Sequence, residues 1–367
     1  MTNDISTTIS PLESTALKEA RAKFAVRPLY FAILLGGIVV VLFAELMIGT
    51  VWIPLTDILK ILVGGEPTRE TWTRIIIDLR MPRAITALFA GAALGVSGLL
   101  MQTLFRNPLA SPWTLGLSAG AGFGVAIVVT VAGMGGTYFF GSFSALGSVS
   151  LAVAAALGST LVLLLILAVS KRVSTVTLLI VGLMLHYLFE GFISVVLHFT
   201  DETQARLYGG WDDGSFAKIT WEQIGVLIPI VVVGLIVSQL LVKPLNALLL
   251  GENYARTLGL TVSTARLWAF GVTAILAGAV TAFCGPVVFL GIAIPHLCRG
   301  LFNTSDHRIL IPACILMGSL LALIADLFTH LPWQKHVFHL NTVNALIGAP
   351  VVLWIILRQR NSKALEL

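Results

Sequence analysis

The sequence predicts an all-α membrane protein with about ten transmembrane helices. Of its 367 residues 57% are hydrophobic and only 11% are charged, and the mean hydropathy is +0.95. Soluble domains carry about 25% charged residues, so water is not the main solvent of this chain. The composition excludes a disordered protein and an ordinary cytosolic enzyme. The net charge of +5 is too small to predict a nucleic-acid partner.

Ten apolar segments account for this composition. A bilayer core of roughly 30 Å needs about 20 residues per helix, and the eighth segment, bracketed by prolines, is the shortest. The first segment has no small-residue cleavage site, which favours an uncleaved span over a signal peptide. The predicted spans are 28–50, 82–103, 112–133, 143–169, 176–199, 223–242, 266–283, 286–301, 308–328 and 340–357.

The spans are rich in glycine, with Gly91, Gly95 and Gly98 in the second. Small residues allow helices to approach closely in lipid, so we predict one packed bundle without internal repeats. The predicted organisation, in order along the chain, is a cytoplasmic tail, a transmembrane permease domain and a second cytoplasmic tail, at 1–27, 28–358 and 359–367.

The distribution of Lys and Arg predicts that both termini are cytoplasmic. With this orientation 15 of the 23 basic residues lie inside and eight lie outside. Five of the outer eight fall in the loop 51–83. A positive cluster on the outer side runs against the usual rule, so we expect this loop to have a function.

No catalytic or cofactor motif is present in the sequence. The glycine-rich stretch 115–124 lacks the Lys-Ser/Thr of a phosphate-binding loop. No Ser/His/Asp or His-Glu-x-x-His arrangement occurs either. We therefore predict that the chain is not an enzyme and needs no cofactor or metal. Cys284, Cys298 and Cys314 are odd in number and lie in apolar runs, which predicts buried free thiols.

Several separated motifs occur in a characteristic order. They are Arg80-Met-Pro-Arg83, Gly91 to Gly98, Gln102, Arg106-Asn-Pro-Leu-Ala110, Leu115 to Ala121, Leu250-Gly-Glu-Asn-Tyr-Ala255 with Leu258-Gly259, Gly285 to Gly291, Pro295-His296, Arg299, Asp306-His-Arg308, Ala325-Asp326 and Ile347-Gly-Ala-Pro350. In this order the chain resembles the FecCD-type (BtuC-like) permeases, the membrane subunits of ABC importers for iron-siderophores, haem and vitamin B12. The resemblance spans about residues 28–358.

The resemblance implies a type II ABC importer permease fold in the inner (plasma) membrane. It also implies a homodimer or paired permease with the path between the subunits. Two cytoplasmic ABC ATPase subunits and a periplasmic or lipid-anchored substrate-binding protein would complete the assembly, with membrane lipid around it.

The resemblance places ATPase coupling in the loop 243–266, where proline and glycine predict short helices. Glu252 and Arg256 could pair at i, i+4, and the alternative is an ordinary interfacial loop. The loop 299–308 is a second candidate. The coupling residues expected are Leu250, Gly251, Glu252, Ala255, Arg256, Leu258 and Gly259.

The resemblance assigns Arg80 and Arg83 to docking of the binding protein, where charge would fix the register. The alternative is that both arginines anchor the second span at the headgroups. The family's second docking arginine is replaced here by His330. His336 and His339 lie nearby, so this loop could ligate haem iron or a transition metal, or could be ordinary polar surface.

The translocation path is expected to involve the fifth span, where His186, Glu190 and Ser194 form a polar stripe. Ionisable groups within a span usually face a bundle interior or a cavity, so the stripe could line the path, or His186 could pair with Glu190. Gln102 matches a glutamine of the family. Glu45 has no counterpart and is expected to reach the outer interface.

The function predicted is the permease of an ATP-driven importer, with iron-siderophore complexes as the leading cargo. Vitamin B12 or haem is the alternative within the family. An ion-coupled secondary transporter using Glu190 or Asp326 is a rival, although the match of Asp326 to the family favours ATP coupling. A membrane-embedded enzyme is the weakest alternative.

Overall fold

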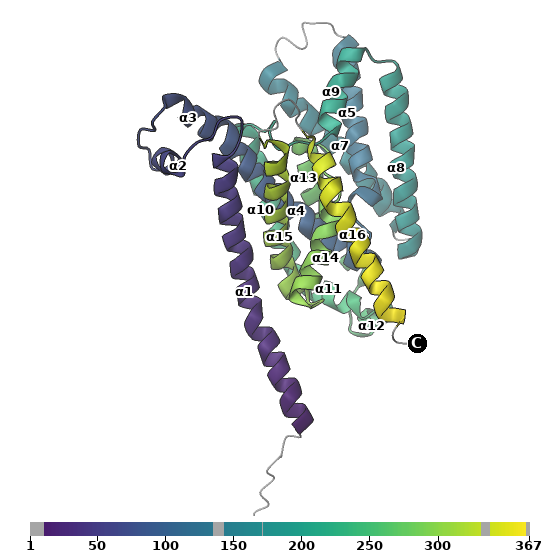
Figure 1. The fold of residues 1–367 in the computed structure, drawn as a ribbon. Coiled ribbons are helices and arrows are strands. Elements are labelled where there is room, and N and C mark those ends of the chain that lie inside the picture. Colours follow the sequence, from purple (N-terminus) through teal and green to yellow (C-terminus); the bar gives the residue numbers. More distant parts are fainter. Residues whose placement is uncertain (1–10, 135–142, 171, 332–337, 365–367) are drawn as a thin grey trace, which may run out of the picture.

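The computed structural model describes residues 11–134, 143–170, 172–331 and 338–364, and within them every regular element is a helix (Figure 1). In these described ranges, seven helical stretches are long and apolar enough to cross a membrane. They lie in α1 (Pro11–Met47), the continuous run of α3 (Glu70–Arg74), η1 (Ile75–Arg80) and α4 (Met81–Phe105), α7 (Phe143–Ser170), α8 (Thr175–His198), α10 (Trp221–Leu240), α13 (Val262–Cys284) and α15 (His307–Thr329).

Three shorter apolar helices complete the set that the sequence predicts. They are Leu117–Val131 of α5 (Leu117–Met134), the whole of α14 (Leu290–Phe302), and Leu340–Leu353 of α16 (Leu340–Ala364). Each of the ten predicted segments therefore coincides with a helix, and the all-α membrane fold is confirmed. The second span begins earlier than expected, because the helix runs without interruption from Glu70 through η1 into α4.

Among the described residues, the short elements that connect the spans are α2 (Leu55–Leu62), η2 (Trp113–Leu115), α9 (Glu202–Asp212), α11 (Val242–Leu249) and α12 (Glu252–Thr257). The short helices expected in the loop 243–266 correspond to α11 and α12. Neither α2 nor α9 follows from the search for apolar segments, since both are too short to span a bilayer.

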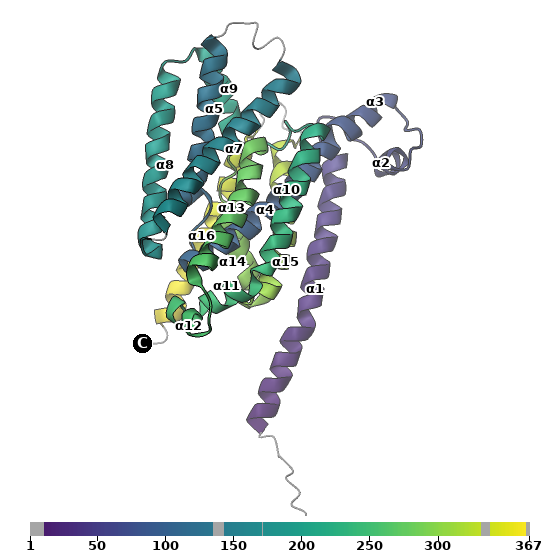
Figure 2. The same cartoon turned by 180° about the vertical axis from the view of Figure 1, so that it is seen from behind.

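Helix α4 forms the centre of the bundle and packs against α10, α13, α14 and α15 (Figures 1 and 2). Two of these helices come so close to α4 that glycine is required at the points of contact. A Cβ atom on Gly98 would overlap the carbonyl oxygen of Gly291 in α14, and one on Gly91 would overlap that of Gly318 in α15. Backbone contact at these points explains the glycine-rich second span.

A second group of helices, α5, α7 and α8, lies on one flank of the bundle, and α1 lies on the opposite flank (Figures 1 and 2). In this group α5 and α7 pack through Gly120 and Gly158. The three cysteines are buried free thiols, as predicted.

The two ends of the bundle carry different short helices. Helices α2, α3 and α9 lie at one end, here called the α9 end, and α11 and α12 lie at the other, the α12 end (Figure 1). The start of α1 and the end of α16 both lie at the α12 end (Figure 1). This agrees with termini on one side of the membrane, and the assignment of that side to the cytoplasm stays a prediction.

Candidate functional site

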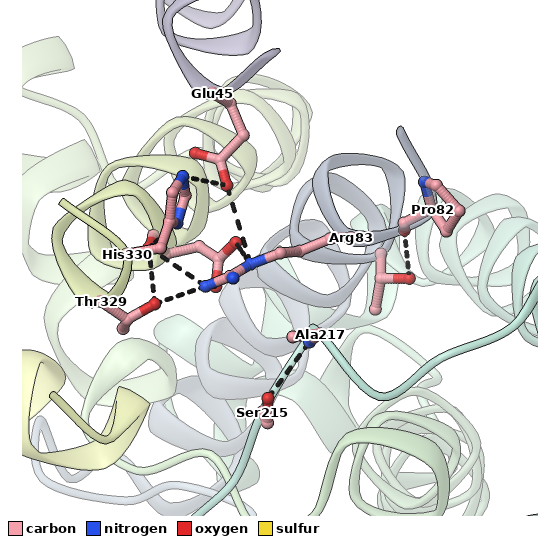
Figure 3. Close-up of polar contacts among 9 residues, drawn as sticks. Glu45, Pro82, Arg83, Ser215, Ala217, Thr329 and His330 are labelled. Atoms are coloured by element: carbon pink, nitrogen blue, oxygen red, sulfur yellow. Dashed lines mark hydrogen bonds and ion pairs between the residues drawn. The ribbon is translucent and has the colours of Figure 1, made fainter. Parts of the chain in front are cut away.

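A buried cluster of charged side chains joins α4 and α15 at the α9 end (Figure 3). The guanidinium of Arg83 donates two hydrogen bonds to the carboxylate of Asp326, from Nε to Oδ2 at 2.5 Å and from Nη2 to Oδ1 at 2.9 Å. Nη2 also donates to Thr329 Oγ1. Asp326 is only 1% exposed, so this bidentate ion pair is strong and geometrically specific.

Glu45 adds α1 to the same cluster. Its Oε1 atom lies 4.0 Å from Arg83 Nε and 3.7 Å from His330 Nε2. The expectation that Glu45 reaches the outer interface is wrong, because its side chain is buried against α4 and α15. Within the described residues, neither carboxyl oxygen of Glu45 accepts a hydrogen bond, so its contact with Arg83 is a longer one than the bidentate pair that Arg83 forms with Asp326.

His330 replaces the family's arginine without replacing its charge. Its Nδ1 atom lies 2.9 Å from the carbonyl oxygen of Asp326. Burial and the neighbouring charge of Arg83 lower the pKa of His330 to about 4. The ring is therefore neutral near pH 7, and any contact it makes with a binding protein is a hydrogen bond.

The cluster fits an ion pair better than a metal. Glu45, Asp326 and His330 offer ligand atoms within 4.8 Å of one another, but Arg83 occupies both carboxylate oxygens of Asp326. His339 has a partner of its own, Asp213, whose Oδ2 is 3.1 Å from Nδ1. His336 lies outside the described residues.

Arg80 is also held by its own chain. Its Nη1 atom donates to the Leu46 carbonyl at 2.6 Å and its Nη2 atom to the Val51 carbonyl at 2.5 Å. These bonds fix the end of α1 against the start of α4. Both predicted docking arginines therefore have structural partners within the chain, and their contact with a binding protein stays a prediction.

The predicted coupling residues form a compact turn at the α12 end. Gly251 and Gly259 have φ values of 109° and 82°, which favour glycine, and they bracket α12. Ala255 is fully buried. The predicted partner of Glu252 was Arg256, but Glu252 forms its ion pair with Arg266 of α13, which fixes α12 to a span.

An apolar stripe covers the outside of this turn. Leu250, Tyr254 and Leu258 follow one another at intervals of four residues and are 63%, 52% and 61% exposed. Leu250 precedes Gly251, whose positive φ interrupts the helix, and Leu258 follows the end of α12, so the three side chains belong to the turn as a whole rather than to one helical face. Tyr254 was absent from the predicted coupling set, and only the folded turn reveals that its side chain is exposed.

The second candidate loop is fixed to α11. The side chain of Asn246 donates to Asp306 Oδ1 at 2.7 Å and accepts from the His307 backbone at 3.0 Å. Burial opposes ionisation of Asp306, but hydrogen bonds from the Arg308 N–H and Asn246 hold its pKa below the usual value. The predicted coupling turn and the start of α15 are therefore fixed to the same helix.

The predicted path residues divide between two environments. His186 is buried, with its ring centroid 4.5 Å from that of Trp113. Glu190 and Ser194 are exposed on α8. Within the part of the chain that the structure describes, no ion pair joins His186 to Glu190, so the alternative of a buried pair is not supported. A path along α8 stays a prediction for the exposed residues.

Gln102 lies inside the bundle. Its Nε2 atom donates to the Ile292 carbonyl at 3.1 Å and its Oε1 atom accepts from Arg299 at 2.5 Å. Both polar groups of a side chain that is 3% exposed are thus used to join α4 to α14. Its role in a path has no support from these contacts and stays a prediction.

Asn341 is a structural residue that the sequence did not single out as a site. It stands at the start of α16 (Leu340–Ala364). Its Nδ2 atom donates to the Pro286 carbonyl at 2.8 Å, and its Oδ1 atom accepts from the Val288 N–H at 3.1 Å.

Nearby, partial desolvation and the charges of Glu190 and Asp213 raise the pKa of Asp212 to about 6.

Known proteins are similar to this chain in sequence and in fold. The FecCD transport family matches residues 37–358. The vitamin B12 import system permease proteins BtuC of Klebsiella pneumoniae subsp. pneumoniae and Citrobacter koseri are 34% and 35% identical. The matches cover 88% and 77% of this chain, and 92% and 83% of the relatives.

A solved structure has the same arrangement of helices. It is described as "An inward-facing conformation of a putative metal-chelate type ABC transporter", with a TM-score of 0.78 and 26% identity. The match covers 90% of this chain and 99% of that one. From the family match, the curated relatives and this fold together, the chain belongs to the FecCD transport family and is a multi-span ABC importer permease.

Proposed function

We propose that this permease imports a metal chelate, with iron-siderophore complexes as the leading cargo. The observation that carries the proposal is the similarity over nearly the whole chain to a solved transporter described as metal-chelate type. Cobalamin is the second candidate, because the curated relatives are vitamin B12 permeases. Both cargoes are large metal complexes, so the same kind of path serves either one.

The path in this proposal lies between two permease copies along α8. Eight large apolar side chains of this helix and its end are exposed, together with Glu190 and Ser194. A second copy covering this face would bury the apolar residues and leave the two polar ones along the path. ATPase subunits would bind at the α12 end and a binding protein at the α9 end.

Uptake by the complete transporter tests the cargo. The permease is reconstituted in proteoliposomes with its ATPase and binding protein, and radioactive iron-siderophore and cobalt-labelled cobalamin are offered separately. We expect uptake of the iron chelate that requires ATP. Uptake of cobalamin alone would favour the second candidate. Uptake driven by a proton gradient without ATP would contradict the proposal.

The exposed stripe of the coupling turn predicts how the ATPase binds. Replacing Tyr254 by aspartate should lower the amount of ATPase that co-purifies with the permease by about tenfold or more, as expected for a central aromatic contact. The fold should be unaffected because the side chain is 52% exposed.

The control for this prediction is Leu207→Asp. Leu207 is similarly exposed, at 48%, but lies in α9 at the opposite end of the bundle. This variant should retain the ATPase. Equal retention by both variants would show that the stripe does not form the ATPase contact.

A further inference from the structure

Residues between α1 and α4 form a small unit with its own apolar core. The core consists of Leu46, Ile53, Ile58, Ile61, Trp72 and Ile76. Asp57 holds the unit closed, because its Oδ1 atom accepts from both the backbone N–H and the hydroxyl of Thr68 at 2.9 Å. The unit extends sideways beyond α1, away from the rest of the bundle (Figures 1 and 2).

Helix α2 in this unit has two apolar faces. Ile58 and Ile61 face the core and are 0% and 7% exposed. Leu55, Leu59 and Leu62 lie on another face, at the i, i+4 and i+7 positions of one helical side. They are 40%, 46% and 43% exposed. Exposed apolar residues gathered on one face in this way mark a surface that contacts protein or membrane.

The exposed face of α2 and the outward face of α1 line one groove. Its volume is about 590 Å³ and its lining is almost entirely apolar. The α1 residues that line it include Val39 and Val40, which are 47% and 68% exposed along a span. From the other side the groove is lined by Trp52, Leu55 and Leu59.

We infer that α2 lies in the membrane interface, in the leaflet where α1 ends, and that the groove between α1 and α2 holds the acyl chain of a phospholipid. The groove is continuous with the lipid-facing surface of α1, which makes lipid its natural occupant. An apolar lining suits an acyl chain. A bound peptide would instead need partners for its backbone polar groups.

The polar residues of α2 agree with this placement. Lys60 keeps 54% of its side chain exposed although its Nζ atom lies 3.6 Å from Asp57 Oδ1, and a lysine at an interface can extend its ammonium group to the headgroups. Trp52, 61% exposed at the edge of the groove, belongs to a residue type enriched at the membrane interface. The basic loop predicted from the sequence thus includes an element that faces lipid.

Spin labels on two neighbouring residues test the position of α2. The native cysteines are at most 3% exposed, so Leu59→Cys and Lys60→Cys can be labelled selectively in the full-length protein. In phospholipid vesicles, the label at residue 59 should collide mainly with oxygen and the label at residue 60 mainly with a water-soluble nickel chelate.

Equal nickel accessibility at the two positions would overturn the inference. So would a residue-59 label that is open to nickel until the purified binding protein is added, since this would identify a protein-docking surface. The groove itself is tested with phospholipids brominated on the acyl chain. They should quench wild-type fluorescence more than that of Trp52→Phe, and identical quenching would exclude an acyl chain beside Trp52.

Discussion

Replacing Arg83 by alanine is expected to destabilise the folded permease by about 3–5 kcal/mol, the range for breaking a buried ion pair. The substitution leaves the carboxylate of Asp326, which is 1% exposed, buried without the guanidinium that binds both of its oxygens. It also removes a contact between α4 and α15, two helices that meet at the centre of the bundle. Denaturant unfolding in mixed micelles measures the change.

Three further variants make this prediction specific. Arg83→Lys keeps the charge but loses the bidentate geometry, so it should be intermediate. Adding Asp326→Asn to Arg83→Ala should recover part of the loss, because one uncompensated charge disappears. Arg206→Ala breaks an exposed ion pair with Glu202, 78% and 79% exposed, and should change stability by less than about 1 kcal/mol. A similar effect of Arg83→Ala and Arg206→Ala would contradict the argument.

Leucine at Gly98 is expected to prevent α4 from packing against α14. Even a Cβ atom at this position overlaps the Gly291 carbonyl oxygen, and the neighbouring atoms belong to the backbone, which cannot rotate away. Overpacking costs typically about 1–3 kcal/mol and occasionally more. A leucine that separates two backbones should be at or above this range. The yield of monodisperse protein in size-exclusion chromatography should fall sharply.

Gly271→Leu is the matched control for this experiment. Gly271 lies in the middle of α13, and a Cβ atom there meets nothing within 4 Å. Its yield should stay close to that of the wild type. If the yield of monodisperse protein fell for both variants, any large residue in a span would prevent folding. The specific contact between Gly98 and Gly291 would then not be the cause.

The transmembrane helices could be predicted because their signal is local. Twenty consecutive apolar residues identify a span without knowledge of its neighbours, and all ten predicted segments are helices. The interfacial helix α2 and the polar helix α9 carry no such signal. Their positions depend on contacts such as those of Asp57 with Thr68, which fix a short segment only after the chain has folded.

The candidate site could be predicted only in part. The family resemblance singled out Arg83, Asp326 and the coupling turn by their motifs. It did not reveal that Glu45 joins Arg83, because Glu45 matches no motif and lies on a different helix. For the same reason Glu252 was expected to pair with its near neighbour Arg256, whereas its partner in the folded chain is Arg266.

The sequence by itself determined that this protein lies in a membrane, how many apolar segments it has and which family it belongs to, because hydropathy and motif order are properties of the chain. Only the tertiary structure decided which charges are neutralised inside the bundle and which apolar faces stay exposed. Arg83 and Asp326 are separated by 243 positions, and an ion pair over that distance exists only where packing brings two helices together. The exposed faces of α2, α8 and α12 are likewise what the packed helices leave uncovered.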